Sequence, residues 1–258
     1  MFPLKDDIPT PTKPVVNCTM MGLCVLIYLL QQSSPSQLVH EYGMTPAIVS
    51  HPQQQVVVAE QQIIQSPRGQ QLVEHKRKLP APDVAPWLTI LTCTFLHGSL
   101  MHLIGNIWFL YVFGDNVEDR LGKIGYLVFY LGSGIAASLT HYAFQPESVI
   151  PTIGASGAVA GVMGAYMWLY PHARVTTLIP ILFILQLIVV PAPWFLGFWF
   201  VIQLVQGSFS MGNSTAAGVA WWAHAGGFAF GFAVALIAGR KPDTSKERPT
   251  IIVRTPQR

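Results

Sequence analysis

Long apolar segments with almost no charge recur along the chain, and they constrain its fold more than any other feature. Hydrophobic residues make up 51% of the 258 positions and charged residues only 10%, whereas soluble domains carry about 25% charged residues. A helix needs about 20 mainly apolar residues to cross the hydrocarbon core of a membrane. We therefore expect an all-α membrane protein that crosses the membrane several times.

Six segments have the character of membrane helices. They cover residues 15–30, 99–113, 124–144, 153–170, 192–209 and 219–238. The apolar stretch 175–209 is difficult to divide, because Pro180, Pro191 and Pro193 interrupt it. We interpret residues 178–190 as an interfacial or partly embedded segment. The alternative is a seventh span, which a length of about a dozen residues disfavours.

Basic residues predict the orientation, because in short loops they mark the cytoplasmic side. Arg120, Lys123 and Arg174 follow the second and fourth predicted helices, and further basic residues follow the sixth. Both termini are then cytoplasmic. The chain divides into a cytoplasmic amino-terminal segment, a membrane domain and a cytoplasmic basic tail, at residues 1–14, 15–239 and 240–258.

The first loop, about residues 31–86, is external in this topology. It is rich in glutamine interleaved with valine and isoleucine, and two interpretations stay open: partial insertion at the membrane interface, or a plain surface loop. A signal peptide is the alternative for the first apolar segment. The residues after it, Gln31 to Pro35, offer no small-residue cleavage site, which disfavours that alternative.

Charge and cysteine content exclude several kinds of partner. The net charge of +3 is small and spread along the chain, which argues against a nucleic-acid partner. Cys18, Cys24 and Cys93 cannot all pair, and no metal-ligand spacing occurs. We expect no metal and no cofactor, and a lipid bilayer as the surroundings.

Four polar residues lie in the first turns of predicted membrane helices, although polar groups are costly in hydrocarbon. They are His102 and Asn106 on the second helix, Ser156 on the fourth and His224 on the sixth. These three helices run in one direction, so the four residues lie at a similar depth, within roughly 5–12 Å of the helix starts. A shared depth on three helices indicates a functional site.

Glycines predict that two of these helices approach closely. Gly157 and Gly161 are four apart on the fourth helix, and Gly227 and Gly231 are four apart on the sixth. Small residues at this spacing let membrane helices touch. His224 and Gly227 share a helix face, so a short serine side chain can meet the imidazole across the contact.

This arrangement predicts a hydrolase that works below the membrane surface. A serine hydroxyl becomes a strong nucleophile when a base removes its proton, and histidine has a suitable pKa for that exchange. No acidic residue lies near His224 in the spans, so we infer a dyad of Ser156 and His224. His102, Asn106 and the Ser156 N–H are candidate donors to an oxyanion.

These residues resemble the motifs of the rhomboid family of intramembrane serine proteases, over nearly the whole chain outside the first loop and tail. The similar segments are Phe2 to Thr10, typical of bacterial members, His97 to Asn106, Gly154 to Gly157 and Ala223 to Gly227. The resemblance implies a six-helix bundle in a bacterial inner membrane that hydrolyses peptide bonds in or near the transmembrane segments of protein substrates. It implies Ser156 as nucleophile, His224 as general base and acid, and His102 and Asn106 as oxyanion donors. It implies architectural roles for Gly114, Glu118, Gly122, Gly157, Gly161, Gly227 and Gly231.

The chain departs from the family pattern in the length of its first loop, which exceeds that of compact bacterial members, and at two single positions. Leu88 follows Trp87 where many members have arginine, and Ala160 stands where some have an aromatic residue stacked on the base. The resemblance also makes the predicted fifth helix a candidate lateral gate. Two other classes remain as alternatives: a transporter, which predicts charged groups at mid-membrane, and a non-catalytic binder of membrane helices, which would tolerate loss of Ser156 or His224.

Overall fold

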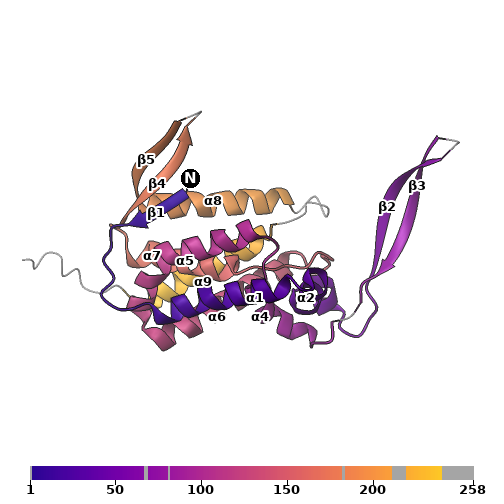
Figure 1. Cartoon of the computed structure of the whole chain (residues 1–258), viewed down its shortest axis with the longest axis horizontal. Coiled ribbons are helices and arrows are strands. Elements are labelled where there is room, and N and C mark those ends of the chain that lie inside the picture. The colour runs from indigo at the N-terminus through magenta and orange to yellow at the C-terminus, as the bar shows by residue number, and fades with distance from the viewer. Residues whose placement is uncertain (1, 67–68, 81, 182–183, 211–218, 240–258) are drawn as a thin grey trace, which may run out of the picture.

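Within the part of the chain that the structure describes, six long helices form one bundle, with their axes lying roughly along one direction (Figure 1). The computed structural model describes all residues except 1, 67–68, 81, 182–183, 211–218 and 240–258. The helices are α1 (Val15–Gln31), α5 (Leu100–Leu121), α6 (Lys123–Phe144), α7 (Ser156–Leu169), α8 (Ala192–Ser210) and α9 (Trp221–Ala238). The expectation of a mainly helical bundle is confirmed, and the predicted basic tail lies outside the described residues.

Among the described residues, α6 and α9 are long and apolar enough to cross a membrane by length and composition alone. A third span results if the segment Pro86–Phe95 and α5, which are bent by 76° relative to each other, are counted together. Val15–Gln31 and Ser156–Leu169 are shorter apolar helices. The count of six spans therefore stays a prediction.

Helix α5 continues to Leu121, so the prediction that it ends near Phe113 was wrong. Polar residues in the part of α5 beyond Phe113 have partners inside the bundle. Glu118 accepts hydrogen bonds from the N–H groups of Val16, at 3.1 Å, and Asn17, at 2.7 Å. The carboxylate thus satisfies free N–H groups at the start of α1. These hydrogen bonds offset the cost of burying a carboxylate, so α5 continues past Glu118.

Asn17 joins α1 to two neighbouring helices in the same region. Its Nδ2 donates to the carbonyl oxygen of Leu110 at 2.9 Å, and its Oδ1 accepts from the hydroxyl of Tyr126 at 2.8 Å. A Cβ on Gly114 would lie 2.4 Å from Asn17 Oδ1. Gly122 ends α5 with a φ of 73°, which glycine adopts at little cost. Gly114 and Glu118 thus contact the start of α1, and Gly122 forms the turn between α5 and α6.

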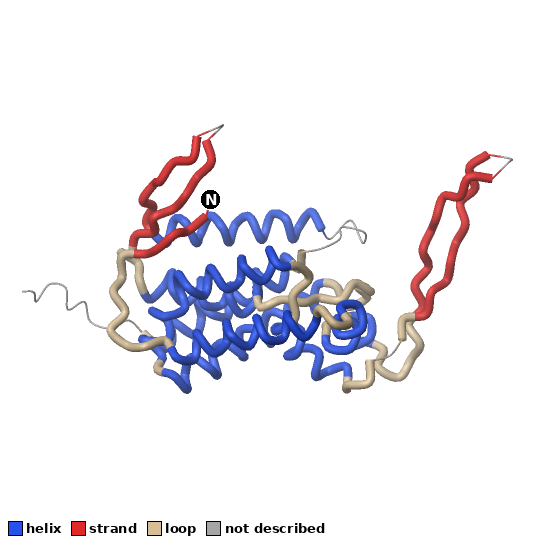
Figure 2. Tube along the Cα trace, viewed as in Figure 1, coloured by secondary structure: helices blue, strands red, loops and turns tan. Residues whose placement is uncertain are grey.

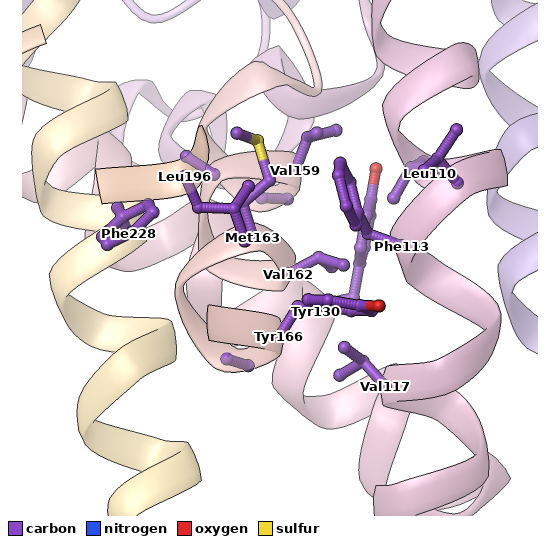
Figure 3. Close-up of a cluster of buried hydrophobic side chains, with 14 of the residues drawn as sticks. Leu110, Phe113, Val117, Tyr130, Val159, Val162, Met163, Tyr166, Leu196 and Phe228 are labelled. Carbon is purple, nitrogen blue, oxygen red and sulfur yellow. The ribbon is translucent and has the colours of Figure 1, made fainter. Parts of the chain in front are cut away.

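The apolar core lies where α5, α6, α7, α8 and α9 face one another (Figure 3). Phe113 of α5 meets Tyr166 of α7 edge-on, with ring centroids 4.9 Å apart. Phe228 of α9 stacks on Phe200 of α8 at 4.5 Å. Because Phe113, Tyr166 and Phe228 are almost completely buried, the core fixes the relative positions of the helices that carry the four polar residues.

Two β-hairpins project from opposite ends of the bundle (Figure 2). Strands β4 (Arg174–Ile181) and β5 (Ile184–Pro191) pair antiparallel, and β1 (Phe2–Asp6) pairs antiparallel with β4, giving the order β1-β4-β5. The alternative of a seventh span over residues 178–190 is therefore wrong. The segment is rich in β-branched residues, which favour strands, and Pro191 ends it directly before α8.

The first loop is largely structured. It contains α2 (Pro35–Tyr42), α3 (Pro46–Ser50), and the hairpin of β2 (Val57–Ser66) and β3 (Gly69–Lys78). The short helices η1 (Pro86–Leu88), α4 (Thr89–Thr92) and η2 (Cys93–Phe95) then lead to α5. Met44 exchanges two backbone hydrogen bonds with Thr152, at 3.0 and 2.8 Å. This pairing ties the loop to the segment directly before Ser156.

Candidate active site

Ser156 is the first residue of α7 and follows a turn that favours glycine. Gly154 has a φ of 125°, which side chains rarely tolerate, and its N–H donates to the carbonyl oxygen of Cys93 at 2.9 Å. A Cβ on Gly154 would lie 2.6 Å from the ring of His102. The turn thus places the Ser156 hydroxyl beside α5, where the first N–H groups of α7 have no partners within the helix.

His224 lies in the first turn of α9, and its ring reaches across to α7. Its Nε2 is 2.7 Å from Ser156 Oγ, a distance that suits a hydrogen bond donated by the hydroxyl to the imidazole. The structure therefore brings together the two residues predicted as nucleophile and base.

The contact between α7 and α9 depends on glycine. A Cβ on Gly227 would lie 2.0 Å from the carbonyl oxygen of Gly157, and one on Gly231 would lie 1.9 Å from that of Gly161. Any larger residue would push the two helices apart. The predicted close approach of these helices is present, and it brings Ser156 within reach of His224.

His102 and Asn106 lie on the face of α5 that is turned toward Ser156. The His102 ring lies edge-on to the ring of His97, with centroids 5.2 Å apart. Asn106 is 6% exposed, and its Nδ2 has no hydrogen-bond partner among the described residues. A buried donor without a partner costs about 1–3 kcal/mol, so this amide is ready to bind an acceptor.

Two cavities meet at Ser156. One, of about 490 Å³, is lined by Ser156, His102 and His224 together with the loop residues before α5 and α9. The other, of about 280 Å³, lies between α5, α7 and α8, and is lined by Ser156, His102, Asn106 and Trp199 among others. Space therefore exists on both sides of the serine hydroxyl, and all four predicted site residues border it.

Three residues of this site were not predicted from the sequence: Trp199 and Gln203 of α8, and Trp221 of α9. Gln203 Oε1 lies 2.8 Å from His224 Nδ1, and the ring of Trp199 lies 5.8 Å from that of His224. Trp221 approaches the same imidazole edge-on at 6.2 Å. These groups surround the base although Ala160 offers no aromatic ring. The sequence signal was the spacing of four between Trp199 and Gln203, which puts both on one face of a helix.

Comparison with known sequences identifies proteins that are similar to this chain. A family model described as Rhomboid domain matches residues 85–241, which is more than half of the chain. The chain belongs to the rhomboid family, and it is an integral membrane protein.

Individual relatives agree over shorter stretches. Rhomboid-like protein 11, chloroplastic, of Arabidopsis thaliana is 40% identical over 76 residues, which are 30% of this chain and 27% of the relative. The putative rhomboid protease YdcA of Bacillus subtilis is 34% identical over 83 residues, 32% of this chain and 41% of the relative. Rhomboid protease GluP of the same organism is 37% identical over 82 residues, 32% of this chain and 16% of the relative. The chain thus spans less than half the length of each.

Proposed function

We propose that this protein is an intramembrane serine endopeptidase that cleaves membrane proteins in or near their transmembrane segments. The observation that carries the proposal is the 2.7 Å contact between Ser156 Oγ and His224 Nε2 beside a buried amide without a partner. Family membership and the relatives named as proteases support the same activity. Transmembrane proteins are the proposed substrates.

The geometry suits acyl transfer in two stages. In the first, Ser156 Oγ attacks the scissile carbonyl carbon while its proton passes to His224 Nε2, and the imidazolium then protonates the leaving amine. In the second, water attacks the acyl-enzyme, gives its proton to His224 and releases the acid as Ser156 regains its proton. Asn106 Nδ2, the Ser156 N–H and the His102 ring are the proposed donors to the oxyanion of each tetrahedral intermediate.

Substrate entry is proposed between α5 and α8. The 280 Å³ cavity lies between these two helices and reaches Ser156. A transmembrane helix hides its carbonyl groups in internal hydrogen bonds, so a substrate must unwind locally before Ser156 reaches it. Segments with glycine or proline near the outer end of their helix are therefore the expected substrates.

The membrane arrangement is part of the proposal. We infer six spans, with residues 1–14 and 240–258 cytoplasmic, residues 31–86 external, and residues 178–190 partly embedded in lipid at the cytoplasmic interface. The amino-terminal motif Phe2 to Thr10 supports a bacterial inner membrane as the location. Labelling of single cysteines at Thr10 and Glu147 from each side tests the orientation; labelling of both from one side would overturn it.

Cleavage of a panel of transmembrane substrates by purified protein in liposomes tests the activity. Wild-type protein should cut at least one substrate, and Ser156→Ala should cut none while keeping its helical circular dichroism and melting temperature. A non-catalytic binder of membrane helices would retain the substrate in both forms and cleave it in neither. Normal cleavage by Ser156→Ala would show that another residue is the nucleophile.

A further inference from the structure

Gln203 is a buried amide on α8 that touches the base from the side opposite Ser156. It is 4% exposed. Its Oε1 lies 2.8 Å from His224 Nδ1, and its Nε2 donates to the carbonyl oxygen of Trp199 at 3.2 Å. We propose that Gln203 is a positioning residue that holds His224 in its active tautomer. The tautomer of His224 then depends on the packing of α8 against α9. The proposal rests on the proposed function.

The orientation of the Gln203 amide follows from its two partners. The carbonyl oxygen of Trp199 is only an acceptor, so the NH₂ group of Gln203 must face it. The amide oxygen then faces His224, and an acceptor at this position requires a proton on Nδ1. Nε2 is left with the lone pair that accepts from Ser156 Oγ.

The opposite tautomer would fail at both ends of the imidazole ring. An N–H on Nε2 would point at Ser156 Oγ and offer no base for its proton. A bare Nδ1 would face the Gln203 oxygen, and two lone pairs would repel. Gln203 thus gives the orientation that an acidic residue gives in soluble serine proteases, but it adds no charge to an apolar region, where charge is costly.

The same contact links α8 to the base. Trp199 and Gln203 lie one turn apart on α8, and both face His224, while Ser156 and His224 themselves belong to α7 and α9. Trp199 also borders the cavity between α5 and α8. A displacement of α8 that widens this cavity therefore removes the acceptor from Nδ1, so that the base is set correctly only when α8 is seated against α9.

Three variants on α8 test the proposal. Gln203→Leu removes the acceptor at similar volume, Gln203→Glu keeps an acceptor, and Gln206→Leu is the matched control because Gln206 is exposed on the same helix. We expect Gln203→Leu to lower kcat by about 10- to 100-fold, less than the roughly 10⁴-fold loss when a charged orienting residue is replaced. KM and melting temperature should stay unchanged. Gln203→Glu should recover part of kcat, and Gln206→Leu should match wild type.

Other results would overturn the assignment. Wild-type kcat in Gln203→Leu would show that the base needs no acceptor at Nδ1. Equal losses of kcat and melting temperature in Gln203→Leu and Gln203→Glu would show a packing role only.

A readout without substrate separates this proposal from the proposed function. In protein with ¹⁵N-labelled histidine, the His224 signals, identified by their loss in His224→Ala, should report a protonated Nδ1 in wild type and a mixture of tautomers in Gln203→Leu. A protein that cleaves nothing but shows this change would contradict the protease function alone. An unchanged tautomer in Gln203→Leu would contradict the role of Gln203.

Discussion

At the scale of single residues, the site combines side chains whose hydrogen-bonding groups have partners with one buried donor that has none among the described residues. Ser156, His224 and Gln203 form a continuous chain of hydrogen bonds across three helices. Asn106 Nδ2 lies buried at the edge of the same space without a partner among the described residues. A preorganised donor of this kind stabilises charge that develops during a reaction and costs little reorganisation.

Asn106→Ala and His102→Ala should therefore lower turnover more than substrate binding. Their proposed contacts form with the oxyanion, which exists only along the reaction path. Loss of one such donor in soluble proteases costs about 10²–10³-fold in rate. Because the remaining donors here share the load, we expect kcat to fall by at least about 10-fold in one or both variants. Kinetics with one substrate in liposomes measure it. Wild-type kcat with a raised KM in both variants would assign α5 to substrate binding.

The residues of the site could be predicted from the sequence only where each carried its own signal. Ser156, His102, Asn106 and His224 stood out because they are polar in apolar helices at one depth. Gln203 is also polar in an apolar helix, yet its role depends on how α8 packs against α9, and a sequence without a structure does not specify that rotation.

At the scale of elements, the contact between α7 and α9 is set by backbone touching backbone. The carbonyl oxygens of Gly157 and Gly161 lie so close to Gly227 and Gly231 that neither glycine of α9 has room for a Cβ. This is how membrane helices pack without a hydrophobic driving force between them. The distance from Ser156 to His224 depends on this closeness.

Gly227→Ala should lower both stability and turnover. A Cβ at this position would lie 2.0 Å from a backbone oxygen, and overpacking of this kind costs about 1–3 kcal/mol. Gly22→Ala is the control, since nothing lies within 4 Å of a Cβ there. Thermal unfolding in detergent and cleavage assays should show losses in the first variant and none in the second. A fully stable and active Gly227→Ala protein would show that neither stability nor turnover depends on the close contact between α7 and α9.

The β4–β5 hairpin should lie in lipid. Ile184, Leu185 and Leu187 are each 64–66% exposed, and no charged residue occurs between residues 175 and 209. Neighbouring exposed apolar side chains of this kind are unfavourable in water. A fluorophore on a single cysteine at Leu187 should be quenched by nitroxide lipids and shielded from aqueous iodide, whereas one at the exposed Glu147 should behave in the opposite way. Equal iodide quenching at both sites would place the hairpin in water.

The helices could be predicted from composition, but the strands could not. A membrane helix is recognisable as one long apolar segment, because all of its backbone hydrogen bonds form within that segment. Strand pairing depends on partners far apart in the chain, such as Phe2 with Leu178. An apolar run of hairpin length therefore looks the same as part of a membrane helix.

At the scale of the whole molecule, the amino-terminal segment fastens the end of the bundle away from Ser156. Trp108 Nε1 donates to the carbonyl oxygen of Pro3 at 2.5 Å. Asp6 accepts hydrogen bonds from Asn116, at 2.8 Å, and from the hydroxyl of Tyr166. Strand β1 thereby joins α5, α7 and the β4–β5 hairpin. These contacts give the amino-terminal segment Phe2 to Thr10 a structural role in the bundle.

This fastening should weaken as pH rises. Burial raises the pKa of Asp6 from 3.8 to about 6, so the folded protein binds more protons than the unfolded one between these values, and stability falls as pH rises through them. Asp6→Asn should remove this contribution. Its melting temperature should exceed that of wild type at about pH 7 and approach it at about pH 4. A difference that does not change with pH would show that the Asp6 carboxyl does not titrate in this range.

The most direct test of the account is the reaction of the intact protein with a fluorophosphonate, followed by mass spectrometry of its peptides. We expect one adduct, on Ser156, because His224 Nε2 lies 2.7 Å from its hydroxyl oxygen and can take up its proton. The adduct should be absent in Ser156→Ala and formed far more slowly in His224→Ala. An adduct on another serine, or labelling at an unchanged rate in His224→Ala, would contradict the Ser156–His224 dyad.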